Sequence, residues 1–178
     1  MNVSRRRWPD ARRVALVSDS HGRLAAPLLA AIAGVDLIVH AGDLGSVEVM
    51  RELRRIAPLC AVRGNNDTPR QWPADEAAQC ARLPEACVIE LAGGALAVVH
   101  GHQWPVVATR HQRLRAAFPD ARCIAYGHSH RRSLDCNDAP WVVNPGASGM
   151  ARTHGGPGWI ILTVSPRIWR LDAFGGPE

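Results

Sequence analysis

The sequence contains no lysine, and all 21 of its basic residues are arginine. Aspartate and glutamate number 16, which leaves a formal net charge of +5. The arginines stand singly or in runs of two or three, in a chain rich in alanine, glycine and proline. We therefore interpret the bias as compositional and the runs as solvated surface. A nucleic acid is not the expected partner, although the summed positive field favours small anions.

Long hydrophobic runs are also missing, although hydrophobic residues make up 47% of the chain. Asp, His or Gly interrupts each apolar run well before the roughly 20 residues that a membrane-spanning helix needs. The N-terminal stretch Arg5-Arg6-Arg7 is basic, but no apolar segment of a secretory signal follows it before Ser18. We therefore expect a cytoplasmic protein without a membrane partner.

Cysteine is sparse and irregularly spaced. An odd number of cysteines without CxxC spacing argues against a disulfide framework and against a zinc site made of thiolates. We expect most of them to be buried thiols in a reducing compartment. The five residues are Cys60, Cys80, Cys87, Cys123 and Cys136.

One domain, 1–178, is the predicted organisation, because this length provides one sizeable core and no repeat or long linker is visible. Residues 1–12 are predicted to form a flexible basic segment ahead of that core. Among the histidines, His40 lies inside an apolar run and is predicted to be a buried core residue. His111 and His154 lie outside the polar clusters described below and are predicted to be surface residues.

Six short runs rich in Val, Ile, Leu and Ala each end abruptly in polar residues. Such runs are typical of buried strands. Apolar residues at helical spacing lie between the early runs, at 24–33 and 47–56, and a third candidate helix covers 105–116. The strand–helix alternation predicts an α/β fold with parallel pairing at first. The runs are 14–17, 36–39, 59–62, 95–99, 123–126 and 141–143.

Later runs are separated only by short turns. Gly93-Gly94 joins 88–91 to 95–99, and Ser165-Pro166-Arg167 joins 159–164 to 168–173. Short connections of this kind predict hairpins with antiparallel strands. The predicted sheets are therefore mixed, with parallel and antiparallel pairs.

Side chains that bind metals follow the strand runs. Because ligand sites of open α/β sheets lie beyond the carboxyl ends of the strands, we expect these side chains to converge. Two carboxylates, one amide and four imidazoles suit divalent manganese, nickel, iron or zinc. Seven ligands exceed what one ion takes, so we expect two ions with Asp43 as the bridge. The predicted ligands are Asp19, His21, Asp43, Asn65, His100, His128 and His130.

The order of these motifs resembles that of the calcineurin-like metallophosphoesterase superfamily. The motifs are Asp-x-His, Gly-Asp, Gly-Asn-x-Asp, His-Gly-His, Gly-His-x-His and Asn-Pro-Gly, over roughly residues 14–164. The resemblance, nearest to the small YfcE-type phosphodiesterases, implies a four-layer sandwich of two mixed β-sheets flanked by helices, with a dinuclear metal site at the strand ends. It implies manganese, with nickel, iron, zinc or magnesium as alternatives. It also assigns Asp19, His21, Asp43 and His130 to the first ion, and Asp43, Asn65, His100 and His128 to the second.

The same resemblance implies hydrolysis of a phosphate ester, above all a phosphodiester, by a hydroxide that bridges two metal ions. Asp43, Asn66 and His102 are the predicted catalytic residues, and Asn66, His102 and Arg63 are the predicted substrate contacts. Many relatives carry histidine where this chain has Asn66. An amide cannot serve as a general acid near neutral pH, so esters with good leaving groups are the expected substrates. Two alternatives stay open: a structural salt bridge for Arg63, and a bracing role in its loop for His102.

A second hypothesis is a non-catalytic scaffold of the same fold, because a eukaryotic retromer subunit that resembles it serves in protein assembly. Such relatives can lose ligands, whereas all seven ligand positions are filled here. The expected partner is therefore a small phosphate-ester substrate. The sequence leaves the oligomeric state open, a homo-oligomer included.

Overall fold

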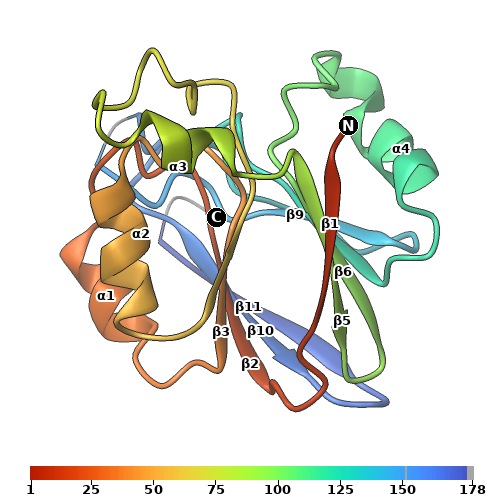
Figure 1. The fold of residues 1–178 in the computed structure, drawn as a ribbon. Coiled ribbons are helices and arrows are strands. Elements are labelled where there is room, and N and C mark those ends of the chain that lie inside the picture. Colours follow the sequence, from red (N-terminus) through yellow and green to blue (C-terminus); the bar gives the residue numbers. More distant parts are fainter. Residues whose placement is uncertain (151, 176–178) are drawn as a thin grey trace.

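The computed structural model describes residues 1–150 and 152–175. Two β-sheets face each other, with helices on their outer sides (Figure 1). One sheet has six strands, in the order β1 (Val3–Arg7), β5 (Ala86–Leu91), β6 (Gly94–Val99), β7 (Cys123–Ala125), β9 (Trp141–Asn144) and β8 (Ser133–Asp135). The other has five, in the order β11 (Trp169–Phe174), β10 (Trp159–Val164), β2 (Arg13–Val17), β3 (Leu37–His40) and β4 (Leu59–Ala61).

Four helices complete the layers among the described residues. The five-stranded sheet is covered by α1 (Ala26–Ala31) and α2 (Val47–Arg54), and α4 (Val107–Ala117) covers the six-stranded sheet (Figure 1). The short helix α3 (Ala77–Ala81) follows β4 in the chain. This arrangement confirms the predicted four-layer α/β sandwich of two mixed sheets. No described helix combines the length and the apolar character that a membrane crossing needs.

Both faces of the central strands are buried, which explains their continuous apolar runs. In β2, Val14 and Leu16 belong to the cluster between the two sheets, whereas Ala15 and Val17 belong to the cluster under the helices. The alternation follows from the period of two residues in a strand. On the opposite outer face, Leu114 of α4 packs with residues of the six-stranded sheet in a third cluster.

Helix α2 shows why the predicted segment 47–56 folds as it does. The Oγ of Ser46 accepts a hydrogen bond from the backbone N–H of Val49 (3.4 Å), which caps the helix N-terminus. Its buried side chains include Met50 and Leu53, which pack into the cluster under the helices. The helix thereby fixes the end of the loop after β3, where the candidate ligand Asp43 lies.

Strand directions place the polar clusters at one rim. The pairs β2–β3, β3–β4, β6–β7 and β7–β9 are parallel, so their carboxyl ends point the same way within each sheet. The two predicted hairpins are confirmed, because β5–β6 and β10–β11 are antiparallel.

The prediction of a flexible segment over 1–12 is wrong for residues 3–7. These residues form β1, which pairs in parallel with β5 from Val3 opposite Ala86 to Arg7 opposite Glu90. The side chains of β1 are largely exposed, so the segment carries no apolar signal in the sequence. Backbone pairing and the Arg7–Glu90 ion pair (2.7 Å) hold it instead.

Candidate metal centre

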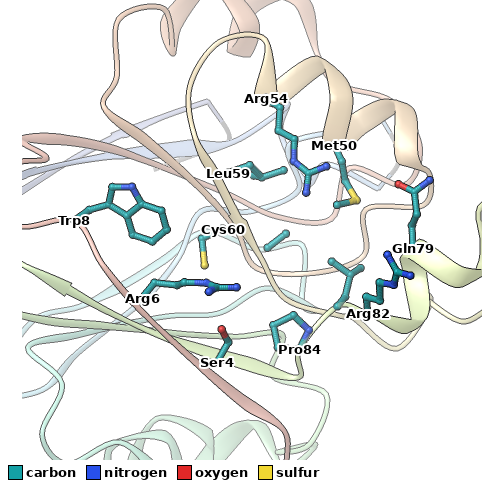
Figure 2. A pocket seen from close by; sticks show the side chains of 12 residues that line it. Ser4, Arg6, Trp8, Met50, Arg54, Leu59, Cys60, Gln79, Arg82 and Pro84 are labelled. Atoms are coloured by element: carbon teal, nitrogen blue, oxygen red, sulfur yellow. The ribbon is translucent and has the colours of Figure 1, made fainter.

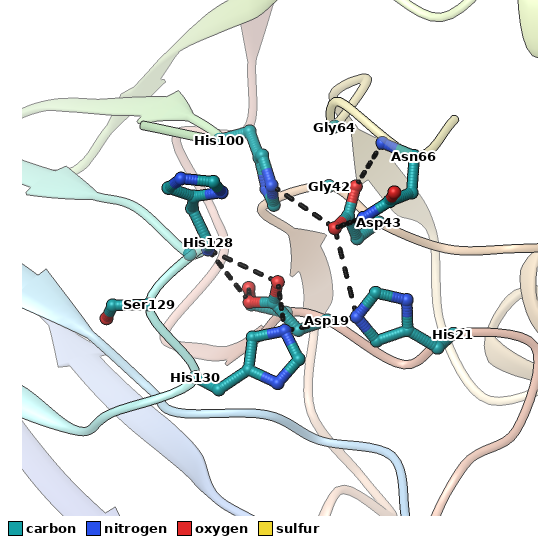
Figure 3. Close-up of polar contacts among 12 residues, drawn as sticks. Asp19, His21, Gly42, Asp43, Gly64, Asn66, His100, His128, Ser129 and His130 are labelled. Carbon is teal, nitrogen blue, oxygen red and sulfur yellow. Dashed lines mark hydrogen bonds and ion pairs between the residues drawn. The ribbon is translucent and has the colours of Figure 1, made fainter. Parts of the chain in front are cut away.

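Five strands deliver the seven predicted ligands to one rim. Asp19 and His21 follow β2, while Asp43 follows β3 and Asn65 follows β4. On the other sheet His100 follows β6, and the motif 128–130 follows β7. In the close-up the side chains of the labelled ligands point toward one another: Asp19, His21, Asp43, His100, His128 and His130 (Figure 3).

The first predicted group of ligands comes together as a compact cluster. One ligand atom from each of Asp19, His21, Asp43 and His130 lies within 4.8 Å of the other three. The Nε2 atoms of His21 and His130 are 3.1 Å apart, and His130 Nε2 lies 3.3 Å from Asp19 Oδ1. His21 Nε2 is 3.8 Å from Asp43 Oδ2. These four residues could therefore hold one ion.

The second predicted group adjoins the first. The Nε2 of His100 lies 3.1 Å from Asn65 Oδ1 and 3.4 Å from Asp43 Oδ2. The rings of His100 and His128 have centroids 5.3 Å apart. Asp43 borders both groups, with His21 on one side and His100 on the other (Figure 3). This is the position that a bridging carboxylate requires.

The chemistry of the cluster fits a divalent cation. The Nε2 atoms of His21 and His130 face each other in a setting where Asp19 and Asp43 are almost fully buried. These residues would offer a cation imidazole nitrogens and carboxylate oxygens together, a set that divalent transition metals prefer.

Backbone strain is concentrated at the ligands. Five of the seven predicted ligands have positive φ angles, between 46° and 69°, although none is glycine. Non-glycine residues adopt this left-handed region rarely and at a cost, and such strain is characteristic of functional sites. Backbone hydrogen bonds from Asp19 N to Gly42 O (2.9 Å) and from His21 N to Asp43 O (3.0 Å) hold the loops in place. The strained residues are Asp19, His21, Asp43, His128 and His130.

Two glycines allow the ligand loops to approach closely. A Cβ atom on Gly64 would collide with the carboxylate of Asp43, and one on Gly127 would collide with Ser18 Oγ and the carboxylate of Asp19. Neither glycine needs a positive φ, so the constraint here is space. The glycines of the Gly-Asn and Gly-His motifs therefore set the distance between loops from different strands.

Asp67 ties the loops after β3 and β4 together. Its Oδ2 accepts from the backbone N–H groups of Leu44 (3.1 Å) and Gly64 (2.9 Å), and its Oδ1 accepts from Gly45 N (3.0 Å) and Trp72 Nε1 (3.0 Å). Three of these four donors are backbone N–H groups, and the fourth is the indole of Trp72. Asp67 thus positions the loop that carries Asp43.

Asn144 shapes the loop of His128 and His130 from the neighbouring strand end. Its Nδ2 donates to Gly127 O (2.8 Å) and Ser129 Oγ (3.1 Å), and its Oδ1 accepts from Gly146 N (2.9 Å). The asparagine of the Asn-Pro-Gly motif therefore holds the loop that carries His128 and His130.

Sequence reasoning missed a pair of serines that supports Asp19. Ser18 Oγ hydrogen-bonds the carboxylate of Asp19. The backbone of Ser18 is in turn bound by Ser148, through Ser148 N to Ser18 O (2.7 Å) and Ser18 N to Ser148 Oγ (3.1 Å). Only the Ser18-Asp19 adjacency could have signalled the first contact, because Ser148 lies 130 positions away.

His40 is a buried core histidine, as predicted. Its Nδ1 accepts from Gly42 N (3.2 Å), so Nε2 carries the proton and faces Ser20 Oγ (2.9 Å). Burial lowers the pKa of His40 to about 4, which keeps the ring neutral near pH 7. It supports the loops after β2 and β3.

Charges inside the centre compensate one another. Burial alone would raise the pKa of Asp43, but His100 and Asn66 bind its carboxylate and hold that pKa well below its usual range. Burial tends to lower the pKa of His100, yet Asp43 and Asp19 outweigh it and raise that pKa. A hydrogen bond to Asp19 likewise raises the pKa of His130. Burial lowers the pKa of His21, which stands at the more open side.

The three predicted substrate contacts occupy different settings. Asn66 turns its side chain to Asp43: Nδ2 donates to Oδ2 (2.6 Å), and its backbone N–H donates to Oδ1 (2.9 Å). His102 lies beside the centre, with its ring centroid 5.5 Å from that of His100. Arg63 Nη2 contacts Glu85 Oε1 (3.1 Å), which is the salt bridge left open as its alternative.

The prediction that His111 is a surface residue is wrong. Its Nδ1 lies 2.8 Å from Asp135 Oδ2, and its Nε2 lies 2.9 Å from the hydroxyl of Tyr126. His111 and Tyr126 border a cavity of about 400 Å³ whose lining also includes Ser129 and Arg131, immediate chain neighbours of the ligands 128 and 130. No local pattern in the sequence predicts this position, because helix α4 brings His111 there from elsewhere in the chain. His154 is exposed, as predicted.

The layered sheets and the cluster of carboxylates and imidazoles define an α/β protein with a candidate metal centre. A model of the calcineurin-like phosphoesterase superfamily domain matches residues 13–167. The chain therefore belongs to the calcineurin-like phosphoesterase superfamily, whose members use divalent metals.

Relatives agree with this assignment. The chain is 26% identical over 165 residues to a probable metallophosphoesterase of Methanothermobacter thermautotrophicus, across 90% of this chain and 89% of the relative. It is 26% identical over 144 residues to a phosphodiesterase of Methanocaldococcus jannaschii, across 75% and 82%. A mutant of Vps29 from Entamoeba histolytica matches with a TM-score of 0.72 and 17% identity, across 93% and 99%. At that identity the likeness to Vps29 concerns the fold.

Proposed function

We propose that this chain hydrolyses phosphodiesters with two divalent metal ions held at the rim. The observation that carries the proposal is the place of Asp43 between two groups of ligands. The similarity to a phosphodiesterase of Methanocaldococcus jannaschii supports the choice of substrate class. Asp19, His21, Asp43 and His130 would hold one ion, and Asp43, Asn65, His100 and His128 the other.

When bound, such a pair of ions neutralises phosphate charge and supplies an activated water near neutral pH. The chain's own residues prepare the site. His100 Nδ1 lies 2.8 Å from the carbonyl of Ala41, which can only accept, so Nδ1 carries a proton. Nε2, which faces Asn65 and Asp43, would be the nitrogen that binds a metal. Asn66 orients the Asp43 carboxylate through two donors. Asn66 is therefore a positioning residue in this proposal.

His102 is the residue that we assign to contact a substrate phosphate. It stands beside His100 and His128, and its Nδ1 is buried without a hydrogen-bond partner among the described residues. Burial, followed by the proximity of His100 and His128, lowers the pKa of His102, so the neutral ring is favoured near pH 7. A neutral imidazole donates a hydrogen bond to phosphate but is a poor general acid there.

Without a strong general acid at the rim, the leaving group departs largely unaided. Aryl phosphodiesters should therefore react much faster than alkyl phosphodiesters, since phenolates are the more stable anions. The test is a comparison of an activated aryl diester, its alkyl counterpart and matched monoesters, with added manganese, nickel or magnesium. We expect turnover that requires metal, stops with a chelator and is greatest for the aryl diester.

Two variants make this experiment specific. His128→Ala should abolish turnover, whereas His154→Ala, at an exposed histidine outside the rim, should leave it unchanged. Circular dichroism of both variants checks that the fold survives. Turnover that persists fully in chelator, or in a folded His128→Ala protein, would contradict the proposal.

A non-catalytic assembly role is the second candidate, and the fold shared with Vps29 is the observation that favours it. The two candidates differ in one measurement. A protein that binds two ions with all ligands in place, yet hydrolyses none of the esters above, would support the assembly role.

A further inference from the structure

A second concave site lies between the two sheets, at the side where an edge strand of each sheet is found. It is bordered by the edge strands β1 and β4 and by helices α2 and α3 (Figure 2). Its volume is about 320 Å³. None of the predicted metal ligands lines it. We call it the arginine cavity, after Arg6, Arg54 and Arg82 in its lining.

These three arginines come from separate elements and meet in one place. Arg6 belongs to β1 and Arg54 to α2, while Arg82 directly follows α3. In the close-up, the guanidinium group of Arg6 reaches in beside Cys60, and that of Arg54 descends from the helix above (Figure 2). No aspartate or glutamate lines the cavity.

Neighbouring arginines behave differently. Arg7 binds Glu90, and both Arg51 of α2 (3.3 Å) and Arg55, which directly follows α2 (3.4 Å), bind Glu48. Among the described residues, by contrast, no hydrogen bond or ion pair holds the guanidinium groups of the cavity. The arginines that face the cavity therefore keep their charge without an acidic partner among the described residues.

Three unpaired positive charges around one hollow repel one another, and a concave wall of protein focuses their field. An anion in the hollow relieves this repulsion. Guanidinium groups bind phosphate with paired, charge-assisted hydrogen bonds, which suits a phosphate better than a halide. The charge of the site therefore points to a phosphate group.

The rest of the lining offers surface for an organic ligand. Trp8 is half-buried and stands at the end of the cavity opposite Gln79, with Leu59 and Met50 between them (Figure 2). An aromatic ring of this kind packs against another flat ring and can stack with a guanidinium. Ser4 and Gln79 add polar groups. The volume lies at the small end of the range for ligand pockets, which suits a compact ligand.

We propose that the arginine cavity binds a nucleoside monophosphate, with the phosphate on Arg6, Arg54 and Arg82 and the base against Trp8. The site is separate from the metal centre and does not depend on the function proposed for that centre. It gives the basic N-terminal run a role, since Arg6 reaches the cavity only because residues 3–7 form β1.

Binding is measured by calorimetry on the full chain, treated with chelator so that the metal centre cannot hold phosphate. Adenosine monophosphate, adenosine and inorganic phosphate are compared. We expect the nucleotide to bind more tightly than either fragment, and its affinity to fall as salt rises. The same affinity is expected in His128→Ala, which separates this site from the metal centre. Loss of binding in His128→Ala would overturn the assignment to the cavity.

Matched variants locate the site. Arg6→Gln and Arg54→Gln should each weaken nucleotide binding by about tenfold, as expected when one charged partner of a phosphate is removed. Arg5→Gln removes the same charge from the same strand at a position outside the cavity lining, and should change affinity less than twofold. Equal effects of Arg5→Gln and Arg6→Gln would overturn the proposal, because binding would then follow net charge alone.

Trp8 tests the nature of the ligand. Trp8→Leu should weaken the binding of the nucleotide and leave the binding of inorganic phosphate unchanged. Trp8→Phe should keep most of the affinity for the nucleotide. Thermal unfolding of each variant checks the fold, and Trp8→Phe serves if Trp8→Leu does not fold. Equal affinities for the nucleotide and for inorganic phosphate in the wild-type protein would overturn the assignment to nucleotides.

Discussion

The metal centre and the arginine cavity both concentrate charge, but only the first balances it within the chain. At the rim, carboxylates and imidazoles bind one another, the backbone is strained, and most ligands are buried or half-buried. In the cavity, three exposed guanidinium groups stand on ordinary strand and helix backbone with no acid in the lining. The metal centre is defined by contacts among its own side chains. The arginine cavity is defined by the absence of acidic side chains from its lining. Substitutions at the rim should therefore lower stability, metal binding or turnover. Substitutions of the cavity arginines should leave the stability of the fold nearly unchanged.

The largest effect is expected for Asp43→Asn. Asp43 borders both groups of ligands, so loss of its charge should weaken the binding of both ions. Turnover of an aryl diester should fall by more than about a hundredfold. Elemental analysis and rate measurements check this. Asp172→Asn, at a carboxylate that binds Arg170 in β11, is the matched control and should change neither. Two tightly held ions in Asp43→Asn would contradict the role of a bridge.

The next effect is on stability, for Asp67→Asn. Each carboxylate oxygen of Asp67 accepts from two N–H groups, so the amide nitrogen of asparagine would face two donors wherever it is placed. We expect a loss of about 3 kcal/mol in the free energy of unfolding, from broken charged hydrogen bonds and unsatisfied donors. Urea denaturation measures it. A loss below about 1 kcal/mol would mean that Asp67 does not hold the two loops.

A smaller effect concerns His40 and pH. Because the pKa of His40 is lowered to about 4 in the folded state, the unfolded chain binds this proton more readily, with a pKa of about 6.5. The stabilising contribution is complete above about pH 6.5 and is lost as the pH falls toward 4. Between pH 7 and pH 5 the wild type should lose about 2 kcal/mol more than His40→Gln, which cannot titrate. Equal losses in urea denaturation at the two pH values would refute this.

The smallest effect is expected for Arg54→Gln, which tests whether the charges in the arginine cavity are uncompensated. Arg54→Gln removes one of three repelling charges and breaks no ion pair or hydrogen bond among the residues that the structure describes. Stability at low salt should therefore rise slightly, by less than about 0.5 kcal/mol. The gain should disappear at high salt, where surface charges are screened. Arg55→Gln, which loses a contact to Glu48, should show no gain. Thermal unfolding at two ionic strengths measures both, and a clear loss in Arg54→Gln would show that the cavity charges are compensated after all.

Local patterns in the sequence predict much of the fold and the ligand cluster. Strands such as β2 and β3 can be predicted because both of their faces are buried, which gives continuous apolar runs. The polar residues that directly follow these runs indicate the ligands. Asp43 stands out for the same reason, at the end of the β3 run. Both signals lie within a few consecutive residues, so no knowledge of tertiary structure is needed to see them.

Features that depend on distant partners could not be predicted. The exposed arginines of β1 resemble a solvated run until β5 is known to pair with them. The turn of Asn66 toward Asp43, and the arginine cavity itself, arise from loops and helices that meet only in three dimensions. In each case the deciding contact joins positions more than twenty residues apart.

The place of β1 also sets an order on folding during synthesis. Residues 3–7 are made well before their partners in β5, which lie 83 positions later in the chain. At about 5–20 residues per second, the first strand waits roughly 4 to 17 seconds for a partner. Meanwhile β2, β3 and β4 can already pair with one another. The six-stranded sheet therefore receives its edge strand β1 only after residues 86–90 have been made, and a nascent chain halted before residue 86 leaves that strand unpaired.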